Sequence, residues 1–293
     1  MSEIEVIEFT DPGCSWAWGT EPKLRLLRWR YDDKLRWRRV LGGLIGDMNH
    51  YVEDFDPVRA AKRYIPYWRK VFVHTNMSYP AHLKWMYSST EPAGRAVKAA
   101  EFQSDELGGA VLRRLREQIF VFGEPADTDE RIIDAVRGVG GLDIDRFSVD
   151  IDSEGADKVF REDWEETRRP NQYVQTLEGD WPGIGRAKHA EGHTRYVFPT
   201  VIFRHTDREE TVPGWCPLED YENAMEYVMP GSTDEQRPDP TPEQYFASWP
   251  TATEHELEVM CGSGATPPRE LVRWDWGEGN FLLRPDEARA RGL

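Results

Sequence analysis

The pattern of apolar and polar positions near the N-terminus predicts a strand, a helix and a second strand. Residues 4–9 alternate apolar and acidic side chains, as half-buried strands do, and the turn sequence Asp-Pro-Gly follows at 11–13. Residues 22–29 have apolar side chains at helical spacing, and residues 35–41 form a second predicted strand before two glycines. Because β-α-β connections are right-handed, we expect these two strands to be parallel.

The middle of the chain has helical periodicity. Apolar side chains recur there at intervals of three and four, which predicts helices at 59–72, 93–102, 109–120, 129–136 and 155–167. Strand-like alternation returns at 200–203 and 210–212, and the turn sequence between them predicts a β-hairpin. A helix that begins with Pro217 and runs to about Val228 follows, because proline is tolerated at the first helical position.

The C-terminal residues predict a small mixed unit after a linker. Residues 232–242 are rich in Ser, Thr, Asp and Pro, a composition typical of linkers. Helices are predicted after Pro242, after Thr253 and after Pro267. Residues 274–283 predict a hairpin around two glycines.

Composition narrows the classes of function. Hydrophobic residues make up 39% of the chain and charged residues 31%, which is ordinary for a globular protein. The apolar runs are shorter than the roughly 18 residues that a membrane span needs, and the N-terminus lacks the basic start and apolar stretch of a secretory signal, so a cytoplasmic location is expected. The net charge of −16 argues against binding nucleic acid or an anionic membrane.

Cys14 is the candidate reactive group. The chain has only three cysteines, too few for a disulfide scaffold, and they have no metal-ligand spacing. Cys14 lies in the turn between the first strand and the first helix, where unsatisfied backbone N–H groups and the helix dipole favour a thiolate. We therefore expect a lowered thiol pKa and nucleophilic chemistry. The alternative is a small buried hydrophobic residue, because free cysteine is often buried.

Three segments carry a family resemblance. They are DPGCSWAWGTEP at 11–22, EPAGRAVKAAEF at 91–102 with the helical sequence that continues to residue 143, and VFPTVIF at 197–203. In this order they resemble the DsbA-like, FrnE-like thioredoxin-fold oxidoreductases. The wider group includes the kappa-class glutathione transferases, isomerases of aromatic carboxylates and mycothiol-dependent DsbA-like reductases.

The resemblance implies an α/β fold with three parts. Residues 1–46 and 178–231 would form the thioredoxin-fold domain, and residues 47–177 a large all-helical DsbA-type insertion. Residues 232–293 lie outside the resemblance and would form the linker and a small C-terminal α(+β) extension.

The active-site motif departs from the family pattern. Members that exchange disulfides use Cys-x-x-Cys, in which the second thiol releases the mixed disulfide. This chain has Cys14, Ser15, Trp16 and Ala17, so alanine stands where the second cysteine would be. Release then requires an outside thiol or Cys216, which lies in the loop before the last helix of the fold. The alternative for Cys216 is simple packing at that helix start.

The resemblance also assigns a substrate-binding region. Pro199 would follow a cis peptide bond and, with Phe198 and Thr200, present backbone to a substrate; a trans proline at a strand start is the alternative. Trp16 and Trp215 would line an apolar groove. In the related transferases a hydroxyl group stabilises the bound thiolate. The resemblance implies this role for Ser15, which is adjacent to Cys14.

Two functions follow from these features. The first is a thiol-dependent oxidoreductase or thiol transferase that works through Cys14 alone, with no tightly bound cofactor and with glutathione or mycothiol as cosubstrate. Its substrate would be a small thiol or a disulfide, including one in a protein. The second is a non-catalytic thioredoxin-fold adaptor that holds a partner for proteolysis. The sequence does not decide whether the protein forms a homodimer.

A metal site is not expected. His189 and His193 are four residues apart with Glu191 between them, which would place both imidazoles on one face of a helix. Gly192 weakens that helix, and no third ligand is evident from the sequence.

Overall fold

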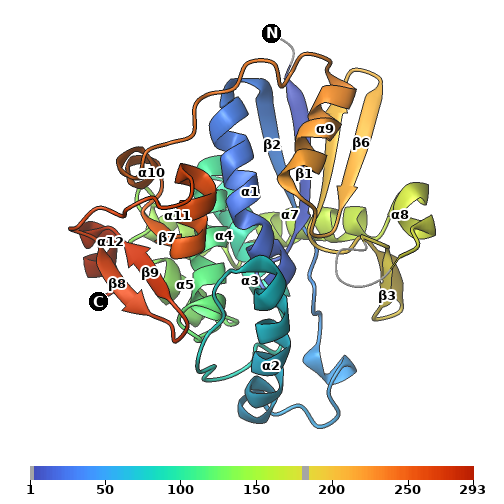
Figure 1. The fold of residues 1–293 in the computed structure, drawn as a ribbon. Coiled ribbons are helices and arrows are strands. Elements are labelled where there is room, and N and C mark those ends of the chain that lie inside the picture. The colour runs from blue at the N-terminus through green and yellow to red at the C-terminus, as the bar shows by residue number, and fades with distance from the viewer. Residues whose placement is uncertain (1–2, 180–184) are drawn as a thin grey trace.

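A four-stranded sheet forms the centre of the computed structural model, which describes residues 3–179 and 185–293 (Figure 1). Its strands are β1 (Ile4–Thr10), β2 (Leu35–Leu41), β5 (Thr200–His205) and β6 (Arg208–Pro213). They lie in the order β2-β1-β5-β6. The strands β1 and β2 are parallel, whereas β5 is antiparallel to β1 and to β6. The predicted parallel pair and the predicted hairpin are therefore confirmed.

The central strand β1 is buried on both faces because its side chains alternate between two apolar clusters. Ile4 and Val6 pack with α1 (Ser15–Tyr31) and α9 (Leu218–Val228), which cover one face of the sheet. Ile7 and Phe9 belong to a second cluster, which includes Phe198. The first helix therefore packs along one face of β1, and its first turn meets the loop before β5 in the second cluster, to which Ala17 also belongs.

The first helix is longer than predicted. It begins at Ser15, and Pro22 lies inside it rather than at its start. The predicted range, based on the spacing of apolar side chains, began at Pro22, but this buried proline is accommodated inside the helix. This extension places Cys14 directly at the N-cap of α1.

In the described part of the chain, seven α-helices lie between β2 and β5. They are α2 (Pro57–Thr75), α3 (Glu91–Glu101), α4 (Asp105–Phe120), α5 (Asp129–Val136), α6 (Ile144–Asp150), α7 (Glu154–Thr167) and α8 (Gln172–Thr176). The alanines of α3 allow close packing against α4 and α7, and one apolar cluster joins α3 to α7. The five predicted helices are confirmed. The helices α6 and α8 were not predicted, because they are too short to show periodicity.

The remaining elements are short. They are the 3₁₀ helices Asp32–Lys34 and Met48–His50, the hairpin of β3 (Lys188–Ala190) and β4 (His193–Arg195), and the C-terminal α10 (Pro242–Ser248), β7 (Thr251–Thr253), α11 (Glu254–Cys261), β8 (Val272–Asp275), β9 (Asn280–Leu283) and α12 (Pro285–Ala290). The predicted C-terminal hairpin is confirmed as β8 and β9, to which β7 adds a third strand.

The helix predicted after Pro267 is wrong, because the chain enters β8 instead. Pro268 follows directly, and a proline disfavours the helical conformation of the residue before it. The two prolines therefore favour an extended approach to the strand.

The C-terminal elements pack against both earlier parts of the chain. Leu26 and Trp29 of α1 form an apolar cluster with Tyr245 and Met260 from α10 and α11. Phe281 of β9 belongs to a different cluster, which contains residues of α2 and the end of α4. The C-terminal unit thus packs against α1 through one cluster and against α2 and α4 through the other.

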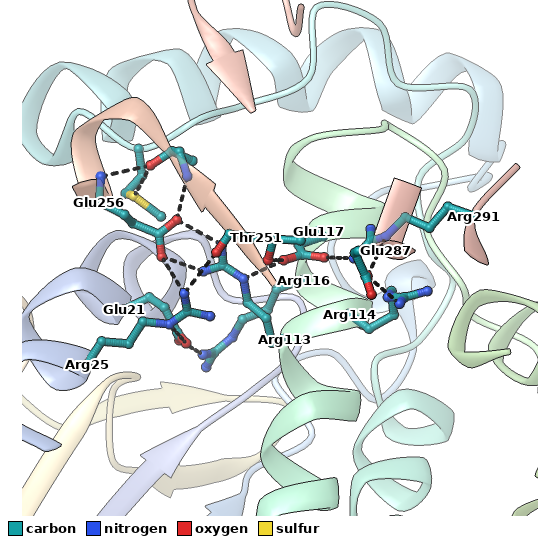
Figure 2. A network of polar contacts seen from close by, with 12 residues as sticks. Glu21, Arg25, Arg113, Arg114, Arg116, Glu117, Thr251, Glu256, Glu287 and Arg291 are labelled. Atoms are coloured by element: carbon teal, nitrogen blue, oxygen red, sulfur yellow. Dashed lines mark hydrogen bonds and ion pairs between the residues drawn. The ribbon is translucent and has the colours of Figure 1, made fainter. Parts of the chain in front are cut away.

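A ladder of mostly buried arginines and glutamates crosses the same contact, and Figure 2 shows the part of it that runs from Arg116 and Glu21 to Arg114. We name it the arginine–glutamate ladder. Its members alternate in sign, and neighbouring charged atoms are no more than 3.8 Å apart along the order Arg28, Glu8, Arg116, Glu21, Arg25, Glu256, Arg113, Glu117, Arg291, Glu287 and Arg114. It links β1, α1 and α4 to α11 and α12.

Glu117 lies in the C-terminal half of this ladder. Its side chain is 1% exposed and pairs with Arg113 at 2.6 Å and with Arg291. Burial alone would raise the pKa of Glu117, but Arg291 and Arg113 hold that pKa well below its ordinary value. The carboxylate therefore stays charged inside the protein and compensates two guanidinium groups.

Glu117→Gln is expected to lower the free energy of unfolding by about 3–5 kcal/mol, because it leaves buried arginines short of a counter-charge. Urea denaturation at neutral pH measures the change. Glu165→Gln is the matched control: Glu165 is 61% exposed, pairs with Arg169, and should cost less than about 1 kcal/mol. Equal losses in the two variants would show that the ladder does not stabilise the fold.

Candidate functional site at the Cys14 turn

Cys14 caps the first helix after a tight turn. Its backbone is extended, its N–H donates to the Asp11 carbonyl at 3.2 Å, and its carbonyl accepts from Trp18 at 3.0 Å. Gly13 is required before it, because a Cβ there would lie 2.6 Å from Cγ2 of Thr90. The turn thus fixes the thiol at the start of α1.

The thiol faces the loop before β5. The Cys14 Sγ donates a hydrogen bond to the Phe198 carbonyl at 3.2 Å, and the Phe198–Pro199 peptide bond is cis, as the family resemblance implies. Gly42 leaves room for this loop, since a Cβ at that position would lie 1.8 Å from the Phe198 ring. Two segments almost two hundred residues apart therefore meet at the sulfur.

The expected lowering of the Cys14 pKa is wrong. Burial raises the pKa of the thiol, and the negative charge of Asp11 acts in the same direction. The backbone N–H groups of Ala17 and Trp16 and the charge of Arg116 oppose this rise without reversing it. The helix N-terminus acts as predicted, but Cys14 is only 5% exposed, and loss of hydration outweighs the helix contribution.

The neighbours of Cys14 in the motif are buried. Ala17 is 1% exposed and packs in the same apolar cluster as Cys14. Ser15 is 8% exposed. Position 17 therefore contributes a methyl group where a second thiol would have to stand.

Cys216 lies apart from the cavity at Cys14. The Cys216 thiol donates a hydrogen bond to the Pro213 carbonyl at 3.3 Å, and the Lys23 ammonium group donates one to the Cys216 carbonyl at 2.5 Å. Burial, together with nearby Asp220, raises the Cys216 pKa to about 11. It lines a separate cavity between β6 and α9, and all three cysteines are free thiols. The two candidate thiols are not brought together in this conformation.

A cavity of about 550 Å³ opens in front of Cys14. Of the predicted substrate-binding residues, Trp16, Phe198 and Trp215 line it. The Trp16 and Trp215 ring centroids are 6.2 Å apart. Thr200 does not line the cavity; it is fully buried, and its hydroxyl donates to the Val197 carbonyl at 2.8 Å.

Pro199 also stays outside the lining, and its role is to position the neighbouring loop. Its carbonyl accepts the N–H of Gly214 at 2.8 Å, and this hydrogen bond fixes the residue before Trp215. Lys23 lies 4.0 Å from the centroid of the Trp215 ring and packs the loop onto α1. The indole N–H of Trp215 is buried without a hydrogen-bond partner.

Most of the aromatic and cationic lining was not predicted from the sequence. These residues are Tyr51, Tyr64, Tyr67, Trp68, Tyr87, Arg63, Lys188 and Arg195. Four of them, Arg63, Tyr64, Tyr67 and Trp68, belong to α2. Their spacings of one, three and four predict that they share one face of a helix, but the sequence does not show that this face points toward Cys14. The described lining contains three cations and no acidic side chain, although the chain has a net charge of −16.

The histidines noted in the sequence do not share a helix. His189 and His193 lie in the β3–β4 hairpin, where His189 pairs with Thr194 across the strands. Glu191 accepts hydrogen bonds from the backbone N–H groups of Gly46 and Asp47. Among residues 3–179 and 185–293, no group of three or more His, Cys, Asp or Glu side chains is arranged to hold a metal ion.

Asp11 is a buried carboxyl group behind the thiol. Its oxygens accept from the backbone N–H groups of Gly13 at 2.8 Å and Leu44 at 2.7 Å, and from the Thr90 hydroxyl at 3.0 Å. Complete burial nevertheless raises the Asp11 pKa to about 6. The sequence suggested only a turn residue here.

The sheet order, the N-capping cysteine and the cis-proline loop define a thioredoxin-fold protein, so the predicted fold class is confirmed. A sequence profile described as thioredoxin matches residues 8–170, which is more than half of the chain. The chain belongs to this thioredoxin family. In the part of the chain that the structure describes, no helix combines the length and the apolar character that crossing a membrane requires.

Curated relatives carry one name. The ClpXP adapter protein SpxH of Shouchella clausii strain KSM-K16 is 32% identical over 229 residues, which cover 77% of this chain and 67% of that protein. The SpxH of Bacillus subtilis strain 168 is 26% identical over 249 residues, which cover 82% of this chain and 71% of that protein. The match to the SpxH of Halalkalibacterium halodurans covers only 54% of that protein.

Solved structures show the same fold at low sequence identity. A putative protein disulfide isomerase from Nitrosomonas europaea has a TM-score of 0.57 at 16% identity, over 77% of this chain and 97% of that one. A probable DsbA oxidoreductase from Streptomyces coelicolor has a TM-score of 0.52 at 16% identity, over 77% and 90% of the two chains. These likenesses establish a shared DsbA-like fold.

Raising the pH from about 4 to 6 should reduce the stability that Asp11 contributes. An unfolded aspartate has a pKa of 3.8 and the folded group one of about 6, so the folded state binds an extra proton between these values. The shift corresponds to about 3 kcal/mol. Urea denaturation from pH 4 to 7 should give a flatter curve for Asp11→Asn, and Asp163, whose pKa is also about 6, contributes to the slope that remains.

Asp134→Asn provides the control for this pH dependence, because Asp134 is 78% exposed and should leave the slope unchanged. Parallel curves for wild type and Asp11→Asn would contradict the assignment. The absolute stability of Asp11→Asn is expected to fall as well, because the amide group cannot accept all three hydrogen bonds.

Alkylation of Cys14 by iodoacetamide should have its midpoint above the value of about 8.5 for a free thiol. The physical reason is the burial that raises its pKa. A Cys216→Ser, Cys261→Ser background leaves Cys14 as the only thiol, and mass spectrometry follows the rate against pH. The urea-unfolded chain is the control and should titrate near 8.5. A midpoint below that of the unfolded chain would restore the original expectation of an activated thiol.

Proposed function

We propose that this protein is an adaptor, which binds a partner protein at the Cys14 cavity and presents it to a ClpXP-type protease. The observation that carries the proposal is Ala17: without a second cysteine in the motif, the site can hold a partner but cannot release a mixed disulfide by itself. The curated relatives at 32% and 26% identity, which are named ClpXP adapters, support the same function.

The state of the Cys14 thiol also favours binding over turnover. A redox enzyme needs a thiolate at neutral pH, whereas burial raises the pKa of this thiol. The hydrogen bond from Sγ to the Phe198 carbonyl uses the protonated form. Cys14 then serves as a packing and hydrogen-bonding residue that holds the loop before β5 in place.

The chemistry of the cavity indicates what a partner would supply. Its aromatic walls suit an apolar or aromatic side chain, and aromatic anchors commonly dominate the energy of protein interfaces. Arg63, Lys188 and Arg195 add positive charge with no acidic side chain in the described lining. We therefore assign to the cavity a partner segment that presents an apolar side chain next to a carboxylate.

A monothiol oxidoreductase or thiol transferase is the second candidate. It is favoured by the position of Cys14, at a helix N-terminus with the N–H groups of Ala17 and Trp16 directed toward its sulfur, and at the wall of an open cavity. The Cys14 thiolate would attack a disulfide, form a mixed disulfide and release the other half as a thiol. An outside thiol, glutathione or mycothiol, would then attack the mixed disulfide and regenerate Cys14.

Protein turnover in the host cell separates the two functions. Half-lives of all detectable proteins are measured by mass spectrometry after translation is stopped, in a deletion strain complemented with wild type, Cys14→Ser or Trp215→Ala. An adaptor predicts a set of proteins that persist in the deletion strain. Wild type and Cys14→Ser should both restore their degradation. Trp215→Ala should not, because losing an aromatic anchor costs about 2 kcal/mol, roughly 30-fold in affinity.

Circular dichroism of the purified variants checks that each is folded, and Trp274→Ala is the matched control for loss of an exposed tryptophan, since Trp274 lies outside the cavity and is 37% exposed. A Cys14→Ser strain that behaves like the deletion would favour the monothiol function. A proteome with no half-life that depends on this protein would reject the adaptor function.

A further inference from the structure

The arginine–glutamate ladder carries one more positive charge than negative charge. It contains six arginines and five glutamates, and because the signs alternate, both ends are arginines. The two end residues, Arg28 and Arg114, line the same cavity, whose volume is about 760 Å³. This cavity lies between α1, β2, α4 and the C-terminal elements, and it is distinct from the one at Cys14.

Unsatisfied donors accompany this surplus charge. Nε of Arg28 and Nη1 of Arg291 are buried without a hydrogen-bond partner, and both residues belong to the cavity wall. The Arg291 side chain is only 6% exposed. Buried N–H groups of guanidinium ions are normally paired, so these two guanidinium groups are incompletely compensated by the protein.

The surplus positive charge is least compensated at the two ends of the ladder. Burial lowers the pKa of Arg28 to about 10, and the neighbouring charge of Arg39 adds to this effect. Burial and the charge of Arg291 also lower the pKa of Arg114. In the middle, Glu256 and Glu117 overcome the effect of burial and raise the pKa of Arg113.

The other acidic residues of the wall do not neutralise this surplus positive charge. Glu3, Asp32, Asp105, Glu106 and Asp286 also line the cavity, but each of them is exposed. Solvent screens exposed carboxylates, whereas the ladder is largely buried. An anion inside the cavity would therefore be attracted mainly by the arginines.

We propose that this cavity is a binding site for a phosphate-bearing small molecule. Guanidinium groups pair with phosphate through two parallel hydrogen bonds, and a phosphate group in the cavity would supply the negative charge that balances the extra arginine. The volume is in the range of small-molecule sites. Trp37, which stacks with Arg28 at 4.0 Å, and Trp249 offer flat apolar surfaces for the rest of the ligand.

Isothermal titration with inorganic phosphate and with AMP tests the site, with sodium chloride keeping the ionic strength constant. Wild type should bind saturably, and Arg28→Met should bind at least about tenfold more weakly, a loss of about 1.4 kcal/mol. Arg169→Met is the matched control: it removes the same charge from an exposed position outside the cavity and should bind like wild type.

The Arg28→Met variant should remain folded. Glu8 keeps Arg116 at 3.8 Å and the Trp37 indole N–H at 2.9 Å, and methionine can pack on the same ring. Without phosphate its melting temperature should equal or exceed that of wild type, because a surplus buried charge has been removed. Arg114→Met, at the other end of the ladder, gives an independent second variant.

The two ligands distinguish the source of the phosphate group. Tighter binding of AMP than of inorganic phosphate assigns the site to a phosphorylated metabolite, and equal binding assigns it to the free ion. Two results would overturn the proposal: the absence of saturable binding of either ligand to wild type, or equal binding by wild type and by both end variants.

Discussion

Every charge buried between α1, α4 and the C-terminal elements needs an opposite charge beside it, and this constraint governs how the parts of the molecule assemble. The arginine–glutamate ladder meets it with residues from five elements. Burying such ions costs several kcal/mol each before their attraction offsets the loss of hydration. Misplacing one element would leave charges unpaired, so the ladder favours a single arrangement of α1, α4 and the C-terminal unit.

The sequence predicted those parts of the fold that depend on local pattern. The parallel opening strands, the β5–β6 hairpin and the long helices follow from side-chain periodicity within each segment. The start of α1 and the absence of a helix after Pro267 did not, because the structural effect of a proline depends on its neighbours. Pro22 lies within a buried helix, whereas Pro268 forces Pro267 toward an extended conformation.

The candidate site was only half accessible to sequence reasoning. The order of the family segments along the chain identified Cys14, Trp16, Phe198 and Trp215. These four residues line one cavity. The tyrosines of α2 were not, because periodicity shows that a helix face exists but not what it faces. The error about the Cys14 pKa has a similar cause: the helix terminus is evident in the sequence, whereas the depth of burial depends on the tertiary structure.

The ladder also affects how the chain folds during synthesis. Its N-terminal members, Glu8 and Glu21, leave the ribosome before Arg116, and Arg113 and Glu117 are made well before Glu256 and Arg291. Chains emerge at roughly 5–20 residues per second, so these ions spend several seconds without their final partners. A nascent chain can therefore form α1 and the helices up to α8 early, but its interior becomes electrically complete only after α12 has been made.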